Sequence, residues 1–164
     1  MQKKADVLYN LKNMLKQQIK NALVTAQKER NEKKVSILRF ALSRIQNEEI
    51  NKQKELTDEE VILILQKLKQ ELEEEKEAAI KAKRADLAQK ANEELNIIAS
   101  YLPKPLSDDE LKQEIQKIIE KNQDLWQKNP KSLIGICLKA LKTKAETKRI
   151  IEVINHLMKK DPTV

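Results

Sequence analysis

The chain of 164 residues contains a single glycine, and no other feature restricts its fold as strongly. Tight β-hairpin turns need residues of positive φ, which glycine supplies most readily, and phosphate-binding loops need several glycines close together. Both are therefore nearly excluded. One histidine and one cysteine likewise exclude a zinc finger and a disulfide framework. The sequence predicts an all-α protein.

Apolar residues recur at steps of three and four along nearly the whole chain, which is the period of an amphipathic helix. Residues 1–100 contain four such stripes, so we expect a helical N-terminal domain of four helices. The first stripe begins with Val7 and Leu11. Thr57 and Glu60 precede the third stripe with the spacing of a capping box, which predicts that a helix begins there.

Two prolines, Pro103 and Pro105, interrupt the helical pattern. Proline breaks a helix interior and pushes the preceding residue into an extended conformation. We therefore expect a linker at residues 101–107 and a second helical domain at residues 108–160. A domain of this size is marginal for a core of its own.

Three helices are expected in the second domain. Ser107 and Glu110 form a capping-box pattern before the first helix, and Pro130 stands at the start of the second, where proline is tolerated. Thr143 and Glu146 form another capping-box pattern, which predicts the start of the third helix.

The net charge of +7 is distributed unevenly along the chain. Residues 48–77 carry eleven acidic and five basic side chains, whereas residues 128–164 carry nine basic and three acidic ones. Of the 33 basic residues 28 are lysines, which are flexible point charges without the bidentate fork of arginine. This composition favours attraction to a polyanion backbone over the reading of base edges.

The best candidate site is a basic cluster in the C-terminal domain, opposed only by Glu146. It straddles a predicted helix end and the following turn, so several cations there can converge on one phosphate backbone. The alternative is a solvated face of a lysine-rich protein. The candidate nucleic-acid-binding residues are Lys139, Lys142, Lys144, Lys148 and Arg149.

No catalytic constellation is visible in the sequence, and we expect no cofactor and no metal site. Cys137 lies on an apolar helix face and is expected to be buried, while His156 is expected at the surface. The acidic residues over 71–77 share a long predicted helix with Lys67, Lys69 and Lys76, and this mixture of charges is typical of a solvated helix face.

Four further side chains have predicted structural roles. Arg39 and Arg44 are expected to form inter-helix salt bridges with carboxylates such as Glu94. Tyr101 is expected to pack the linker onto the first domain, and Trp126 to cover the small one.

The longest apolar run, residues 61–65, is far shorter than the ~20 residues of a membrane span. The N-terminus lacks the apolar core of a signal peptide, and a lone cysteine fits a reducing compartment. These features predict a cytoplasmic protein without a membrane span; a processed organellar protein would share them.

The chain resembles the GatB/YqeY-like family over roughly residues 10–160. The first half of the resemblance lies in the stretch from Leu38 to Val61. Glu94-Leu95 and the stretch from Tyr101 to Ser107 resemble the family's inter-domain signature. The second half is similar to the tail domain that YqeY-type proteins share with the B subunit of glutamine-dependent aminoacyl-tRNA amidotransferases. The residues that carry it are Leu38-Arg39, Ser43, Ile45, Asn47-Glu-Glu-Ile50, Leu56-Thr-Asp-Glu-Glu-Val61, Glu94-Leu95, Tyr101-Leu-Pro103, Pro105-Leu-Ser107, Leu133-Ile-Gly135, Lys139 and Lys142-Thr-Lys-Ala145.

The resemblance implies an accessory protein of translation that binds tRNA or other RNA. It also implies an association with glutamine-dependent amidation, a carbon–nitrogen ligase activity, through amidotransferase subunits. The sequence itself supplies no catalytic residues for that reaction. Thr143 stands where the family has a glycine, so we expect the turn there to differ in shape. The alternative function is a non-catalytic, helical protein-interaction adaptor that contacts other proteins.

Overall fold

The computed structural model describes residues 14–160, which form helices and no strand. Val7 and Leu11 lie outside the described residues. The chain divides into two compact units, of which the first ends at Leu102 and the second begins at Pro103. The helices are α2 (Met14–Lys28), α3 (Glu32–Lys52), α4 (Asp58–Lys81), α5 (Ala85–Ala99), α6 (Asp108–Lys121), α7 (Gln123–Lys128), α8 (Lys131–Leu141) and α9 (Thr147–Lys160).

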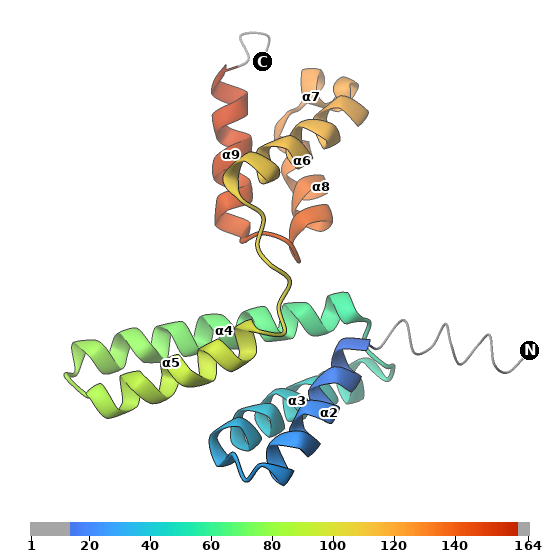
Figure 1. Ribbon diagram of the computed structural model, residues 1–164. Helices are drawn as coiled ribbons and strands as arrows, with labels where there is room; N and C mark the ends of the chain where they lie inside the picture. The colour runs from blue at the N-terminus through green and yellow to red at the C-terminus, as the bar shows by residue number, and fades with distance from the viewer. Residues whose placement is uncertain (1–13, 161–164) are drawn as a thin grey trace, which may run out of the picture. The chain divides into compact units, whose positions relative to one another are not determined.

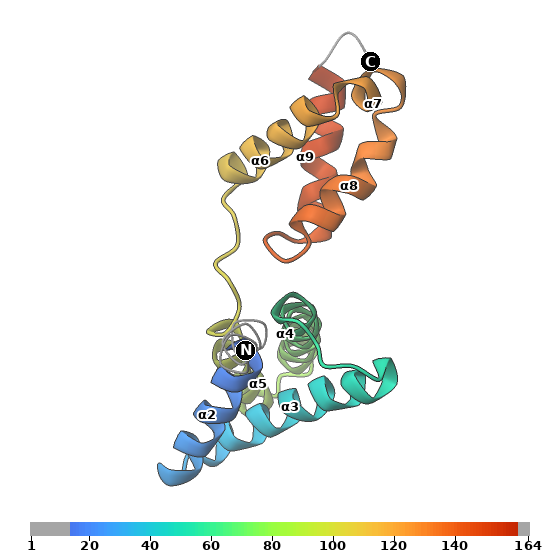
Figure 2. The same cartoon turned by 90° about the vertical axis from the view of Figure 1, so that its right-hand side faces the viewer.

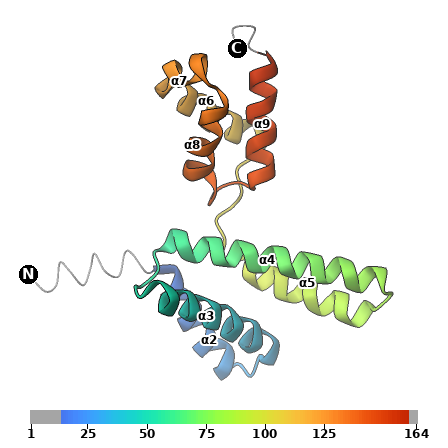
Figure 3. The ribbon, with the colours of Figure 1, turned by 180° about the vertical axis from the view of Figure 1, so that it is seen from behind.

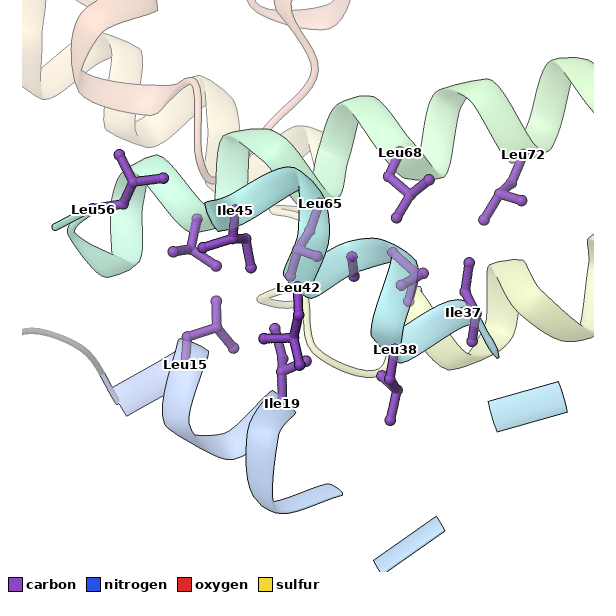
Figure 4. Close-up of a cluster of buried hydrophobic side chains, with 13 residues drawn as sticks. Leu15, Ile19, Ile37, Leu38, Leu42, Ile45, Leu56, Leu65, Leu68 and Leu72 are labelled. Atoms are coloured by element: carbon purple, nitrogen blue, oxygen red, sulfur yellow. The ribbon is translucent and has the colours of Figure 1, made fainter. Parts of the chain in front are cut away.

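The first unit is built from two helical hairpins. Helices α4 and α5 lie side by side along most of their length, and α2 packs against α3 (Figure 1). In the view of Figure 2 α4 is seen nearly end-on while α3 runs across it. Where the hairpins cross, aliphatic side chains from all four helices and from the connection between α3 and α4 form the core (Figure 4): Leu15, Ile19, Ile37, Leu38, Ala41, Leu42, Ile45, Leu56, Val61, Leu65, Leu68, Leu72 and Ile98.

Local side-chain hydrogen bonds fix where two of the helices begin. The Thr57 hydroxyl accepts the backbone N–H of Glu60, and the Glu60 carboxylate accepts that of Thr57, which confirms the predicted capping box of α4. Ser107 and Glu110 do the same at α6. These bonds satisfy donors that have no partner within the helix.

Three helices of the first unit end in a left-handed residue that is not glycine. Arg30, Gln53 and Lys83 have φ values of 55°, 52° and 55°. After α4 the N–H of Lys83 bonds to the carbonyl of Ile80 and that of Arg84 to the carbonyl of Ala79, which is the hydrogen-bond pattern of a Schellman motif. Long polar residues thus occupy positions where glycine is usual.

The second unit has a separate aliphatic core, with α8 and α9 side by side in Figure 3. Three helices were expected here, and this is wrong because the short α7 is a fourth. Six residues are too few to show an apolar stripe, and α7 is held by Trp126, which is 6% exposed. The buried side chains of this core are Leu111, Ile115, Trp126, Leu133, Cys137, Leu141, Ala145, Ile150 and Ile154.

The predicted capping box at Thr143 is also wrong, because α9 begins only at Thr147. Between α8 and α9 the chain turns so that Ala145 enters the core, and the carbonyl of Lys144 accepts a hydrogen bond from the distant N–H of Leu106 at 3.0 Å. This tertiary contact overrides the local helix-start pattern.

The two ends of the predicted linker belong to different units. Tyr101 and Leu102 pack against the core of the first unit, as expected for Tyr101. Leu106 packs against the core of the second unit. Only residues 103–105 lie between these two anchors.

Candidate nucleic-acid interface

The predicted basic residues gather around the turn that joins α8 to α9. Lys139 lies in the last turn of α8 and Lys142 caps its end, while Lys144 lies in the turn itself. Lys148 and Arg149 lie in the first turn of α9. The structure therefore brings all five to one end of the second unit. We call Lys139, Lys142, Lys144, Lys148 and Arg149 the basic turn.

The apolar residues of the turn explain why its lysines face water. Leu141, Ala145 and Ile150 are buried in the core of the second unit. The backbone is fixed by hydrogen bonds to the carbonyl of Leu141 from the N–H groups of Lys144, at 2.8 Å, and Ala145, at 2.9 Å. No described residue of this turn has a positive φ, so Thr143 fits without the freedom of glycine.

The four lysines of the basic turn are exposed, and none forms an ion pair with another described residue. Lysines of the first unit, by contrast, are often neutralised. Lys16 lies 2.6 Å from Glu49 in a pair whose side chains are largely buried, and Lys52 bridges to Glu60. The basic turn therefore offers four neighbouring lysines whose charge is not neutralised by a described acid and is accessible to a polyanion.

Arg149 differs from the four lysines because protein groups hold its guanidinium. Its Nη2 donates to the carbonyl of Leu106 at 2.9 Å and to the carboxylate of Asp108 at 2.5 Å. This contact ties the start of α6 to the start of α9. Arg149 therefore positions the basic turn more than it adds a free charge to it.

The positive charge of the basic turn also acts on a carboxyl group of α6. Lys117 donates a hydrogen bond to Glu114 and lowers the pKa of that carboxyl, and the nearby charge of Lys144 lowers it further. The backbone of Lys144 also lies beside the start of α6, where its carbonyl accepts the N–H of Leu106 at 3.0 Å.

The opposite end of α8 carries a second set of cations, which lies outside the predicted site. Three lysines surround an open hollow of about 490 Å³ between the start of α8 and the end of α9. Lys128 and Lys131 flank Asn129-Pro130 in the sequence, and this spacing could have indicated part of the cluster. Only the pairing of α8 with α9, however, brings Lys159 to them. The lining residues are Lys128, Asn129, Pro130, Lys131, Asn155, Met158 and Lys159.

The two singled-out arginines of α3 have different surroundings. Arg44 forms an inter-helix salt bridge, as predicted, and the bridge is bidentate. Its partner, however, is Glu71 of α4 and not Glu94. Its guanidinium also lies over the ring of Phe40, 4.8 Å from the centroid. Arg39 is exposed and forms no ion pair with a described residue, so the expectation of a salt bridge is wrong for it.

The two candidate reactive side chains, Cys137 and His156, are not part of the basic turn. Cys137 is buried, as expected, and burial raises the pKa of its thiol. His156 is exposed, as expected. Residues 14–160 contain no group of three side chains suited to holding a metal ion, and no helix among them is long and apolar enough to cross a membrane.

Comparisons with known proteins agree with the resemblance seen in the sequence. The family model described as Yqey-like protein matches residues 16–161, which covers both units. No curated protein matches the chain significantly. The family match spans most of the chain, and the protein belongs to the family of YqeY-like proteins.

Proposed function

We propose that the protein is a non-catalytic accessory module that binds RNA through the basic turn of its second unit. The observation that carries the proposal is the set of four exposed lysines without acidic partners among the described residues. Each phosphate that such a lysine neutralises releases condensed counterions, so the binding is driven largely by electrostatics.

The kind of cation sets the expected mode of binding. Free lysines attract a phosphate backbone as point charges, whereas arginine can form two hydrogen bonds to the edge of a guanine base. The only arginine of the basic turn, Arg149, is held by Leu106 and Asp108. We therefore expect recognition of an RNA backbone with little dependence on base sequence.

A titration of bulk tRNA at rising salt tests the proposal. Replacing Lys139, Lys142, Lys144 and Lys148 by glutamine removes four charges without disturbing the buried residues of the turn. The slope of log K against log salt concentration should become shallower by about 2.8 to 3.6, because each phosphate contact contributes about 0.7 to 0.9.

The matched control replaces four exposed lysines of the first unit, none of which pairs with a described acid. This control should keep the wild-type slope. Absence of tRNA binding below about 100 mM salt, where electrostatic binding is strong, contradicts the proposal. So does equal weakening by the two quadruple variants. The control positions are Lys20, Lys28, Lys81 and Lys83.

The resemblance to the amidotransferase tail suggests tRNA as the RNA and glutamine-dependent amidation as its setting. In that case the partner subunits supply the chemistry. Conversion of misacylated tRNA by those subunits should respond to the protein and should persist in a Cys137→Ala, His156→Ala double variant. A requirement for either side chain would place catalysis in this chain instead.

A protein-interaction adaptor is the second candidate, and the exposed apolar side chains of α3 favour it. Phe40 and Ile50 are 47% and 72% exposed. Under this alternative a Phe40→Ser, Ile50→Ser variant loses a partner protein that the wild type retains after ribonuclease treatment. Retention of the partner by the variant argues against α3 as the contact surface.

A further inference from the structure

The only glycine of the chain, Gly135, lies in the interior of α8 and is exposed. After proline, glycine is the residue least favourable to a helix interior. The same chain places arginine, glutamine and lysine at three left-handed positions where glycine is favoured. Its single glycine thus stands where the helix gains nothing from it.

No contact within the described residues requires a glycine at this position. A Cβ atom built on Gly135 meets nothing within 4 Å, and its φ is not positive. Neither close packing nor backbone conformation therefore explains the residue. What the glycine provides is a bare stretch of helix backbone facing outward.

Lysines flank this bare stretch along one side of α8. Lys131, Lys139 and Lys142 are four residues before, four after and seven after Gly135, which places them within about 40° of it around the helix axis. All three are exposed, and none pairs with another described residue. They span about 16 Å along the helix, at about 1.5 Å per residue.

We propose that an RNA backbone lies directly against α8 at Gly135, with Lys131, Lys139 and Lys142 neutralising the phosphates on either side. This rests on the proposed function and deepens it. It adds Lys131 to the interface and directs the strand along α8 from the basic turn toward the hollow at its other end. The missing side chain allows the sugar-phosphate chain to approach the helix more closely than any other residue permits.

The charge of this face favours a polyanion over a partner helix. A bare glycine also suits a closely packed helix from another protein, and Ile136 beside it is 37% exposed. An apolar partner, however, would bring three lysines out of water without acidic partners, which is strongly unfavourable. RNA supplies the compensating charge at every nucleotide.

The test compares Gly135→Leu with Ala140→Leu in the full chain, titrated with bulk tRNA. Ala140 is also exposed but lies about 140° around α8 from Gly135. Gly135→Leu should weaken binding by about fivefold or more, a loss of about 1 kcal/mol. Its unfolding midpoint should stay at or above that of the wild type, since leucine favours the helix. Ala140→Leu should bind within about twofold of the wild type.

A lysine footprint gives an independent readout on the unmodified protein. Bound tRNA should protect Lys131 from acetylation together with Lys139 and Lys142, while Lys121 of α6 stays reactive. An unprotected Lys131 overturns the proposed path along α8.

The possible failures are distinguishable. Wild-type affinity in Gly135→Leu, while the quadruple lysine variant binds weakly, overturns this inference and leaves the proposed function standing. If Gly135→Leu instead abolishes binding of a protein partner and leaves tRNA binding intact, the face belongs to a protein and the inference is wrong. Absence of tRNA binding by the wild type overturns both proposals.

Discussion

Replacing Lys83 by glycine should stabilise the first unit. Lys83 follows α4 with a φ of 55°, in the left-handed region that costs an L-residue about 1–2 kcal/mol. Glycine avoids most of this cost but loses about 0.5–1 kcal/mol more backbone entropy on folding. The Lys83 side chain is exposed and forms no ion pair with a described residue, so its removal adds little. The expected net gain is about 0.5–1 kcal/mol.

Two spectroscopic signals allow the gain to be assigned to the first unit. Trp126 is the only tryptophan of the chain and is buried in the second unit, so its fluorescence reports that unit. Circular dichroism reports the helices of both. For a unit of about 100 residues the gain corresponds to a rise of about 2–8 °C in the circular-dichroism midpoint of the first unit. The fluorescence midpoint should not move.

Lys81→Gly is the matched control. It introduces the same residue two positions earlier, inside the last turn of α4, and should lower stability by about 1 kcal/mol. A Lys83→Gly variant that is no more stable than the wild type refutes the reasoning about the left-handed helix end. If the Trp126 fluorescence transition shifts together with the unfolding transition of the first unit, the two units do not unfold independently.

Three further predictions concern single side chains. Hydrogen bonds from the backbone of Thr57 and from lysine side chains lower the pKa of Glu60 from 4.5 to about 2. The contribution of Glu60 to stability should therefore be complete above about pH 4.5 and be lost as the pH falls toward 2. A Glu60→Gln variant should lack this part of the acid transition in a pH titration of the helical signal. Cys137 should react with a thiol reagent only as fast as the second unit opens, because it is buried and its pKa is raised, and fast labelling of the native protein would contradict this. Ile150→Ala should cost about 2–5 kcal/mol, read by Trp126 fluorescence, because Ile150 is fully buried beneath the basic turn; a smaller loss would mean that the turn collapses around the cavity.

The features predictable from the sequence are those that local chemistry determines. An apolar stripe fixes which face of a helix is buried, and a hydroxyl three residues before a glutamate satisfies orphan backbone donors. The capping boxes at Thr57 and Ser107 were predictable for this reason. Cys137 was predictable as a core residue because the neighbouring residues are apolar at helical spacing.

The errors arise where distant residues determine local structure. The pattern at Thr143 resembles a helix start, but Ala145 enters the core and Leu106 bonds to the neighbouring carbonyl, so α9 begins later. Helix α7 depends on the burial of Trp126 against helices that lie elsewhere in the chain. Neither contact has a sequence pattern of its own.

In the candidate site, too, some features follow from the local sequence and others depend on contacts with distant residues. The surplus of basic residues over 128–164 was visible in the sequence, because few acids lie nearby along the chain. The sequence gives no reason to separate Arg149 from its lysine neighbours, because its acidic partner, Asp108, belongs to α6 and lies 41 residues earlier in the chain. Lys131 is not among the predicted binding residues, although the period of α8 aligns it with Lys139. A charge count along a chain locates a surplus, and only packing determines which of its members are left to bind a partner.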